Sequence, residues 1–176
     1  MFLLLRVWGD MGNFLVLFCR WLEHTHMGVG IVESSWAYPF VQLIHFTGLS
    51  LWVGTSLCLD FRLLGIGSKR QTPFQLSSAL LAWKWIGFFI AVCGGFMLFS
   101  TAATGYIVNP AFRTKLGLLL PLGLLLDIVI QYKMPHWGQT REAPPLAKVA
   151  GLLEAFVWTA VVTAAALIPT FASEPF

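Results

Sequence analysis

The chain has 176 residues, of which 57% are hydrophobic and only 11% are charged. Its mean hydropathy of +0.76 is higher than a water-soluble domain of this length needs for its core. These values indicate an integral membrane protein, and the small formal net charge of +3 argues against a nucleic-acid partner. The three cysteines, Cys19, Cys58 and Cys93, are far apart in apolar sequence, which favours apolar packing over a disulfide or a metal site.

Residues 1–33 predict an amphipathic helix in the membrane interface rather than a full span. Arg6, Asp10 and Asn13 interrupt the apolar character of the first part, and no small-residue cleavage site follows a clean hydrophobic region, as a signal peptide requires. Met11 is an alternative start of the chain. Further along, apolar residues recur at helical spacing. These residues are Phe14, Leu17, Phe18, Trp21 and Leu22.

Residues 34–176 predict an all-α integral membrane fold, a four-transmembrane-helix bundle. A spanning helix needs about 20 mostly apolar residues. Four runs qualify, at about 36–64, 83–106, 111–132 and 149–169. Gly65 and Gly67 favour an end to the first run, and Asn109-Pro110 predicts a turn between the second and the third. The short links make neighbouring helices antiparallel.

Small residues at four-residue spacing occur in two of the predicted spans, where they let a second helix backbone approach closely. Span two has Gly87, Ala91 and Gly95, and span four has Ala160 and Ala164. We interpret both as packing ridges inside the bundle rather than as dimerisation motifs.

Positively charged residues predict the orientation, because Lys and Arg stay preferentially on the cytoplasmic side. The links between spans one and two and between spans three and four carry Arg62, Lys69, Arg70, Lys84, Lys133, Arg141 and Lys148. The other side carries Arg113 and Lys115, with Arg6 and Arg20 if the N-terminal segment lies there. We therefore expect both links in the cytoplasm, and the N-terminal helix and the C-terminus on the periplasmic side.

One imidazole lies well inside span one. The polar and small residues share one face of that helix, which consists of Tyr38, Gln42, His45, Gly48, Leu49, Trp52 and Thr55 or Ser56. His45 lies about 12 Å along the helix at 1.5 Å per residue, near the depth expected for Tyr106 and Lys115. These three side chains are expected to form one polar layer in the outer leaflet, and polar groups at membrane depth are candidates for function.

Two interpretations of His45 compete. In the first, it ligates the iron of a b-type haem or hydrogen-bonds a quinone, with Lys115 and Tyr106 holding polar substituents. In the second, it is a structural donor to Gln42, Tyr106 or a backbone carbonyl. A six-coordinate haem needs a second ligand, and the predicted spans two to four contain no histidine. His24 and His26 are the remaining candidates, since His136 is predicted on the other side; a five-coordinate haem or a Lys115 ligand is the alternative.

Asp127 is a second charged group inside a predicted span. It lies about one turn from the cytoplasmic end of span three, where Lys84 or Arg62 is a suitable partner, and Asp60 lies at the same interface. Most such carboxylates are anchors with a cationic partner. No phosphate-binding loop, HExxH motif or pair of carboxylates on one face indicates soluble enzyme chemistry.

Several motifs give the chain a family resemblance. They are W-x-x-P at Trp36 and Pro39, a histidine in the first span at His45, D-x-R-L-L-G at Asp60, Arg62 and Gly65, and N-P-x-F-x-x-K at Asn109, Pro110, Phe112 and Lys115. With these motifs the chain resembles a family of small uncharacterised membrane proteins of the bacterial inner membrane. The family is similar in plan, more distantly, to copper-resistance membrane proteins and to four-helix b-type cytochromes. That resemblance implies haem and electron transfer between a quinone and a periplasmic acceptor.

Three functions follow as hypotheses. The first is a protein that binds haem b or quinone near the periplasmic face and transfers electrons, alone or as a membrane subunit of a larger complex with a periplasmic redox protein. The second is a non-catalytic accessory or scaffold subunit in which His45 is structural. The third and weakest is a transporter of a small solute or metal, which predicts that Asp127 is needed for flux.

Overall fold

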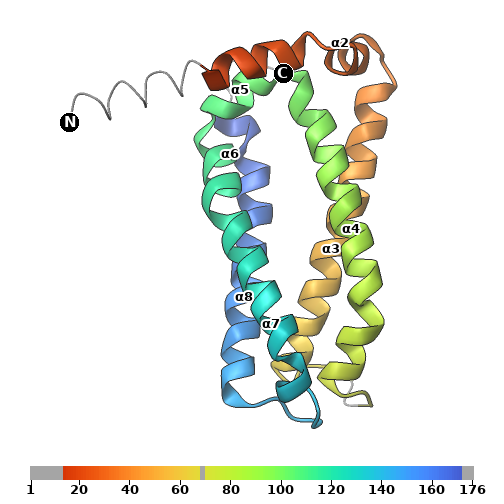
Figure 1. The fold of residues 1–176 in the computed structure, drawn as a ribbon, viewed down its shortest axis with the longest axis vertical. Coiled ribbons are helices and arrows are strands. Elements are labelled where there is room, and N and C mark those ends of the chain that lie inside the picture. Colours follow the sequence, from red (N-terminus) through yellow and green to blue (C-terminus); the bar gives the residue numbers. More distant parts are fainter. Residues whose placement is uncertain (1–13, 68–69, 172–176) are drawn as a thin grey trace, which may run out of the picture.

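The computed structural model describes residues 14–67 and 70–171. Its four long helices pack into a bundle, with the short helices at one end, and the described residues contain no strand (Figure 1). The four helices that are long and apolar enough to cross a membrane are Ala37–Leu63, Pro73–Thr101, Pro110–Trp137 and Pro145–Leu167. The expected all-α four-helix bundle is therefore confirmed, and the chain is a multi-pass membrane protein.

Several helix ends follow from local chemistry. α3, Ala37–Leu63, is followed by Gly65 and Gly67, both with positive φ (86° and 88°), a conformation that suits glycine. α4, Pro73–Thr101, begins with a capping box between Thr72 and Gln75. It therefore begins ten residues before the predicted start of span two, and the residues from Pro73 onward belong to a helix rather than to a link.

The third span is continuous but consists of three segments, a π-helical turn between two α-helices. Asn109 caps α6, Pro110–Thr114, because its side-chain oxygen accepts the amides of Ala111 and Phe112. A π-helical turn, η1 (Lys115–Leu119), follows and leads into α7, Leu120–Trp137. The predicted turn at Asn109-Pro110 is confirmed. It separates this span from α5, Ala103–Val108, which follows α4 after a break at Ala102.

The bundle consists of two helix pairs, α3 with α4 and α7 with α8, Pro145–Leu167 (Figure 1). The first pair is very close: a Cβ on Gly48 would lie 2.4 Å from the Ala91 amide nitrogen, and one on Gly87 would lie 2.6 Å from that of Trp52. The predicted small-residue ridge of span two is thus a helix contact, and its partner is α3 of the same chain.

The interior of the bundle is aromatic at its centre. Trp52 of α3 and Trp158 of α8 meet edge to face with ring centroids 4.6 Å apart, and Phe88 packs on Trp52 at 4.8 Å. Gly123 leaves room for the Trp158 ring, which is fully buried. Through this aromatic group, α4 and α8 both pack against α3.

The helical residues 14–23 and α2, His26–Glu33, lie across one end of the bundle, called here the α2 end (Figure 1). Cys19 and Leu22 pack on Ala103, and the Glu23 carboxylate accepts the amide and the hydroxyl of Thr104, both at 2.7 Å. Of the predicted apolar stripe only Leu22 is buried. The other four members are exposed, namely Phe14, Leu17, Phe18 and Trp21. Predictions for residues 1–13 lie outside the described part.

Candidate functional site

His45 is held in place by a backbone carbonyl of the neighbouring helix. Its Nδ1 lies 2.7 Å from the Ala91 carbonyl oxygen of α4. Because a carbonyl only accepts hydrogen bonds, Nδ1 carries the proton, and Nε2 of the neutral ring has a free lone pair. No hydrogen bond to Nε2 is found among the described residues, and the side chain is half-buried. Of the structural roles predicted for His45, the bond to a backbone carbonyl is the one formed.

Two glycines of α4 make the space that the imidazole occupies. A Cβ on Gly95 would lie 2.9 Å from the His45 Cε1, and one on Gly94 would lie 3.0 Å from the His45 Cα. Any larger residue at either position would push the ring or the helix away. Gly94 and Gly95, together with the Ala91 carbonyl, therefore fix both the position and the orientation of the ring.

Among the predicted site residues, Lys115 is the one whose charge interacts with the His45 imidazole. It is half-buried and opens the π-helical turn η1. Such turns redirect side chains and occur often at functional sites. Within the described ranges Lys115 has no ion-pair partner. A single unpaired ammonium group near a fixed imidazole suits a ligand with a negative or carbonyl oxygen.

Tyr106 of α5 belongs to an aromatic group at the α2 end rather than to the imidazole. Its hydroxyl interacts with that of Tyr38, and its ring packs on Phe112, with centroids 5.3 Å apart, and on Phe99. Burial, with a further contribution from Tyr38, raises the pKa of Tyr106 from 10.0 to about 12. The hydroxyl of Tyr106 therefore stays protonated over a wide pH range, with Tyr38 as its partner.

The other predicted site residues are less well placed. Gln42 lies half-buried one turn before His45 and has no hydrogen bond among the residues described. His24 is exposed and directs Nδ1 to the Arg20 carbonyl at 2.7 Å, and His26 is exposed at the start of α2. Across residues 14–67 and 70–171, no group of three His, Cys, Asp or Glu side chains is arranged to hold a metal ion. None of the contacts among the described residues brings a second imidazole to His45.

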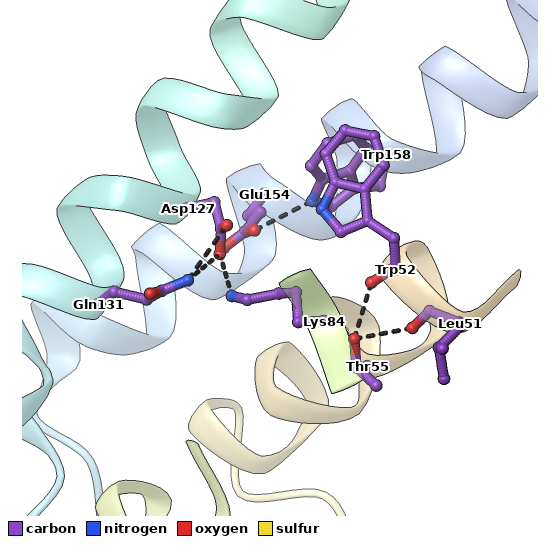
Figure 2. Close-up of polar contacts among 8 residues, drawn as sticks. All are labelled: Leu51, Trp52, Thr55, Lys84, Asp127, Gln131, Glu154 and Trp158. Atoms are coloured by element: carbon purple, nitrogen blue, oxygen red, sulfur yellow. Dashed lines mark hydrogen bonds and ion pairs between the residues drawn. The ribbon is translucent and has the colours of Figure 1, made fainter. Parts of the chain in front are cut away.

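A second polar group, which we call the acidic cluster, consists of Asp60, Lys84, Asp127 and Glu154, one from each long helix. All four are buried, with at most 4% of each residue exposed. Lys84 forms an ion pair with Asp127, and Trp158 donates to Glu154 at 2.9 Å (Figure 2). The predicted pairing of Asp127 with a cation is confirmed.

Of the two cations predicted as partners of Asp127, only Lys84 pairs with it. Arg62 instead donates to the carbonyl oxygens of Gln71 and Arg141, at 2.8 and 2.9 Å, and so ties the two links of this end together. The prediction that Lys84 lies in a link is wrong. It lies in the fourth turn of α4, because the capping box at Thr72 begins that helix early.

Sequence analysis missed the grouping of Asp60 with Glu154. Gly151 brings α8 against the last turns of α3, since a Cβ there would lie 3.3 Å from the Asp60 carbonyl oxygen. The two carboxyl groups are then neighbours. The missed signal was Glu154 itself, a carboxyl inside a predicted span, where an ionisable residue indicates function by default.

Comparisons of the chain with models of protein families, with characterised proteins and with solved structures found no match. The family resemblance given above therefore stays a prediction.

Proposed function

We propose that the protein is a membrane redox protein that binds a quinone, or a haem b, against His45. The observation that supports this most is the fixed imidazole with a free Nε2 lone pair, half-buried at membrane depth. A purely structural histidine needs only the bond to the Ala91 carbonyl, and it leaves the second nitrogen and the ammonium group of Lys115 unexplained. A quinol, the reduced form of a quinone, has two oxygens: one hydroxyl can donate to Nε2, and the other oxygen can accept from the Lys115 ammonium.

A quinol is the ligand that best matches the hydrogen-bonding capacity of His45, because its hydroxyl can donate to Nε2. Nε2 accepts the hydrogen bond of a quinol hydroxyl, while the ammonium of Lys115 donates to the second oxygen. Oxidation of the quinol to a quinone releases two protons and two electrons. His45 takes one proton through Nε2, the second proton passes from the other hydroxyl to water, and the two electrons pass to a redox partner protein. The bond to the Ala91 carbonyl favours this reaction, because it stabilises the imidazolium that forms.

Haem b is the second ligand that the donors fit. Nε2 of His45 would hold the haem iron and Lys115 would pair with a propionate, and bound haem would supply one-electron exchange. The Nδ1 bond to a carbonyl fixes the tautomer that ligation needs. We rank haem below quinone because only one imidazole is available.

With the predicted orientation, the α2 end faces the periplasm of a bacterial inner membrane. The half of the bundle that contains His45 then lies in the outer leaflet, where a quinol would release its protons to the periplasm. In this proposal the protein works alone or as the membrane subunit of a larger complex.

The test measures how much quinone and haem is bound to the protein after purification from its native membranes in mild detergent. Extracted quinone and a reduced-minus-oxidised visible spectrum are each quantified per chain for the wild type, for His45→Ala and for His136→Ala. His136 is an exposed histidine at the other end of the bundle, so it serves as the matched control. We expect near-stoichiometric ligand in the wild type and in His136→Ala, and its loss in His45→Ala. A wild-type protein that folds, and contains and rebinds neither ligand, contradicts the proposal.

A further inference from the structure

The acidic cluster contains more negative than positive groups. Asp60, Asp127 and Glu154 face one another from α3, α7 and α8, and Lys84 of α4 is the cation among them. Arg62 lies two residues beyond Asp60, but its guanidinium is occupied by the carbonyls at the end of the bundle. Three ionised carboxylates would therefore leave a net charge of about −2 in a buried site, which is very unfavourable.

The three carboxyl groups differ in the donors that they receive. Asp127 accepts from Lys84 and, at 3.2 Å, from the Gln131 amide (Figure 2). Glu154 accepts from the Trp158 indole. Asp60 is fully buried and accepts from no donor within the described part of the chain; the group that its carboxyl meets is the Glu154 carboxyl. A carboxylate without any donor is the one that takes up a proton first.

A second unpartnered group supports a site at this position. Ser56 is 2% exposed, and its hydroxyl has no hydrogen-bond partner among the described residues. It lies one turn before Asp60 on the same face of α3, since residues four apart in a helix are neighbours. Because Ser56 and Asp60 are both buried and unsatisfied one turn apart, the cluster is short of hydrogen-bond donors, and a bound proton would supply one.

We propose that Asp60 and Glu154 together bind one exchangeable proton. The protonated Asp60 carboxyl donates to the Glu154 carboxylate, whose charge is further stabilised by Trp158. A metal ion is the less suitable ligand, because no group of three ligating side chains in the described residues has the geometry to hold one. One bound proton reduces the net charge of the cluster from about −2 to about −1. Loading transfers a proton from water to Asp60, and release returns it.

This site is separate from the quinone proposal. Asp60 lies in the last turn of α3, whereas His45 lies in the third turn from the other end of the same helix. The proton site requires no bound quinone or haem, so either proposal can fail while the other holds.

The experiment is infrared spectroscopy of the full-length protein in lipid nanodiscs at neutral pH. A protonated carboxylic acid has a carbonyl stretch that a carboxylate lacks, and this band shifts in D2O when the proton exchanges. We compare the wild type with Asp60→Asn, Glu154→Gln and the matched control Glu33→Gln, which removes an exposed carboxylate. We expect the band in the wild type and the control, its loss in Asp60→Asn, and a shifted band in Glu154→Gln.

Each other outcome decides against the proposal. A wild-type spectrum without a protonated carboxyl band at neutral pH overturns it, and this arm needs no variant to fold. A band that persists unchanged in Asp60→Asn assigns the proton elsewhere. A band that does not shift in D2O shows a trapped proton rather than an exchangeable one. A wild-type protein without the band that sodium ions stabilise against unfolding has a cation at this site instead.

Discussion

The contact between α3 and α4 makes a sharp prediction for Gly48→Ala. The added methyl carbon would lie 2.4 Å from the Ala91 amide nitrogen and 2.9 Å from its Cα, where ordinary contact begins near 3.4 Å. Both neighbouring atoms belong to the backbone and cannot rotate away. The helices must therefore separate locally by about 1 Å, which removes a quarter to a half of the dispersion energy of the contacts involved.

The size of the effect follows from two opposing terms. Overpacking a tight site costs about 1–3 kcal/mol, and a contact with backbone belongs at the upper end. Replacing Gly by Ala within a helix contributes about 1 kcal/mol in the other direction. We expect Gly48→Ala to lose about 2 kcal/mol of the free energy of unfolding. Gly54→Ala, on the same helix with nothing within 4 Å of its Cβ, should be neutral or gain up to about 1 kcal/mol.

The assay is reversible unfolding in mixed detergent micelles, followed by helical circular dichroism, with the two variants measured side by side. A difference of about 2–3 kcal/mol between them is expected from the two terms above. Equal stabilities would refute the close approach of the two helices. A small loss accompanied by weaker ligand binding would instead show that the strain moves the Ala91 carbonyl away from His45.

Three further predictions concern other parts of the bundle. Lys84→Met leaves the Asp127 carboxylate buried without its cation and should cost about 3–5 kcal/mol of unfolding free energy, most of which Lys84→Met/Asp127→Leu should restore. Asn109→Ala removes the cap of α6 and should cost about 0.5–2 kcal/mol by the same assay. An ultraviolet titration should show one tyrosinate, absent from Tyr106→Phe, forming near pH 12. Because the Tyr106 pKa is raised from 10.0, stability should fall as the pH rises through this window.

Much of the architecture could be predicted from the sequence because lipid solubility is a local property. Four apolar runs, the glycines after the first span and the Asn109-Pro110 turn each depend on residues close together in the chain. The start of α4 was predicted ten residues late because hydropathy reports membrane depth and not helix length. A helix can extend beyond the hydrocarbon, and its first residue is set by the capping box at Thr72 rather than by hydropathy.

The sites could be predicted only in part. The inward face of His45 follows from helical periodicity, and the pairing of Asp127 with Lys84 follows from charge and depth. The choice of the Ala91 carbonyl as partner of His45 depends on the distance between two helices, which no local pattern gives. The meeting of Asp60 with Glu154 depends in the same way on Gly151, which lets α8 approach α3.

The Lys84–Asp127 pair has a consequence for biosynthesis. Lys84 precedes Asp127 by 43 residues, so the ribosome delivers α4 to the membrane before its anionic partner exists. Lys84 lies at the beginning of the apolar part of α4, where its long side chain can reach the lipid headgroups until Asp127 is inserted. The first helical hairpin thus enters the bilayer with an unmet charge. When the second hairpin is inserted, Asp127 pairs with Lys84, and this ion pair favours assembly of the two hairpins.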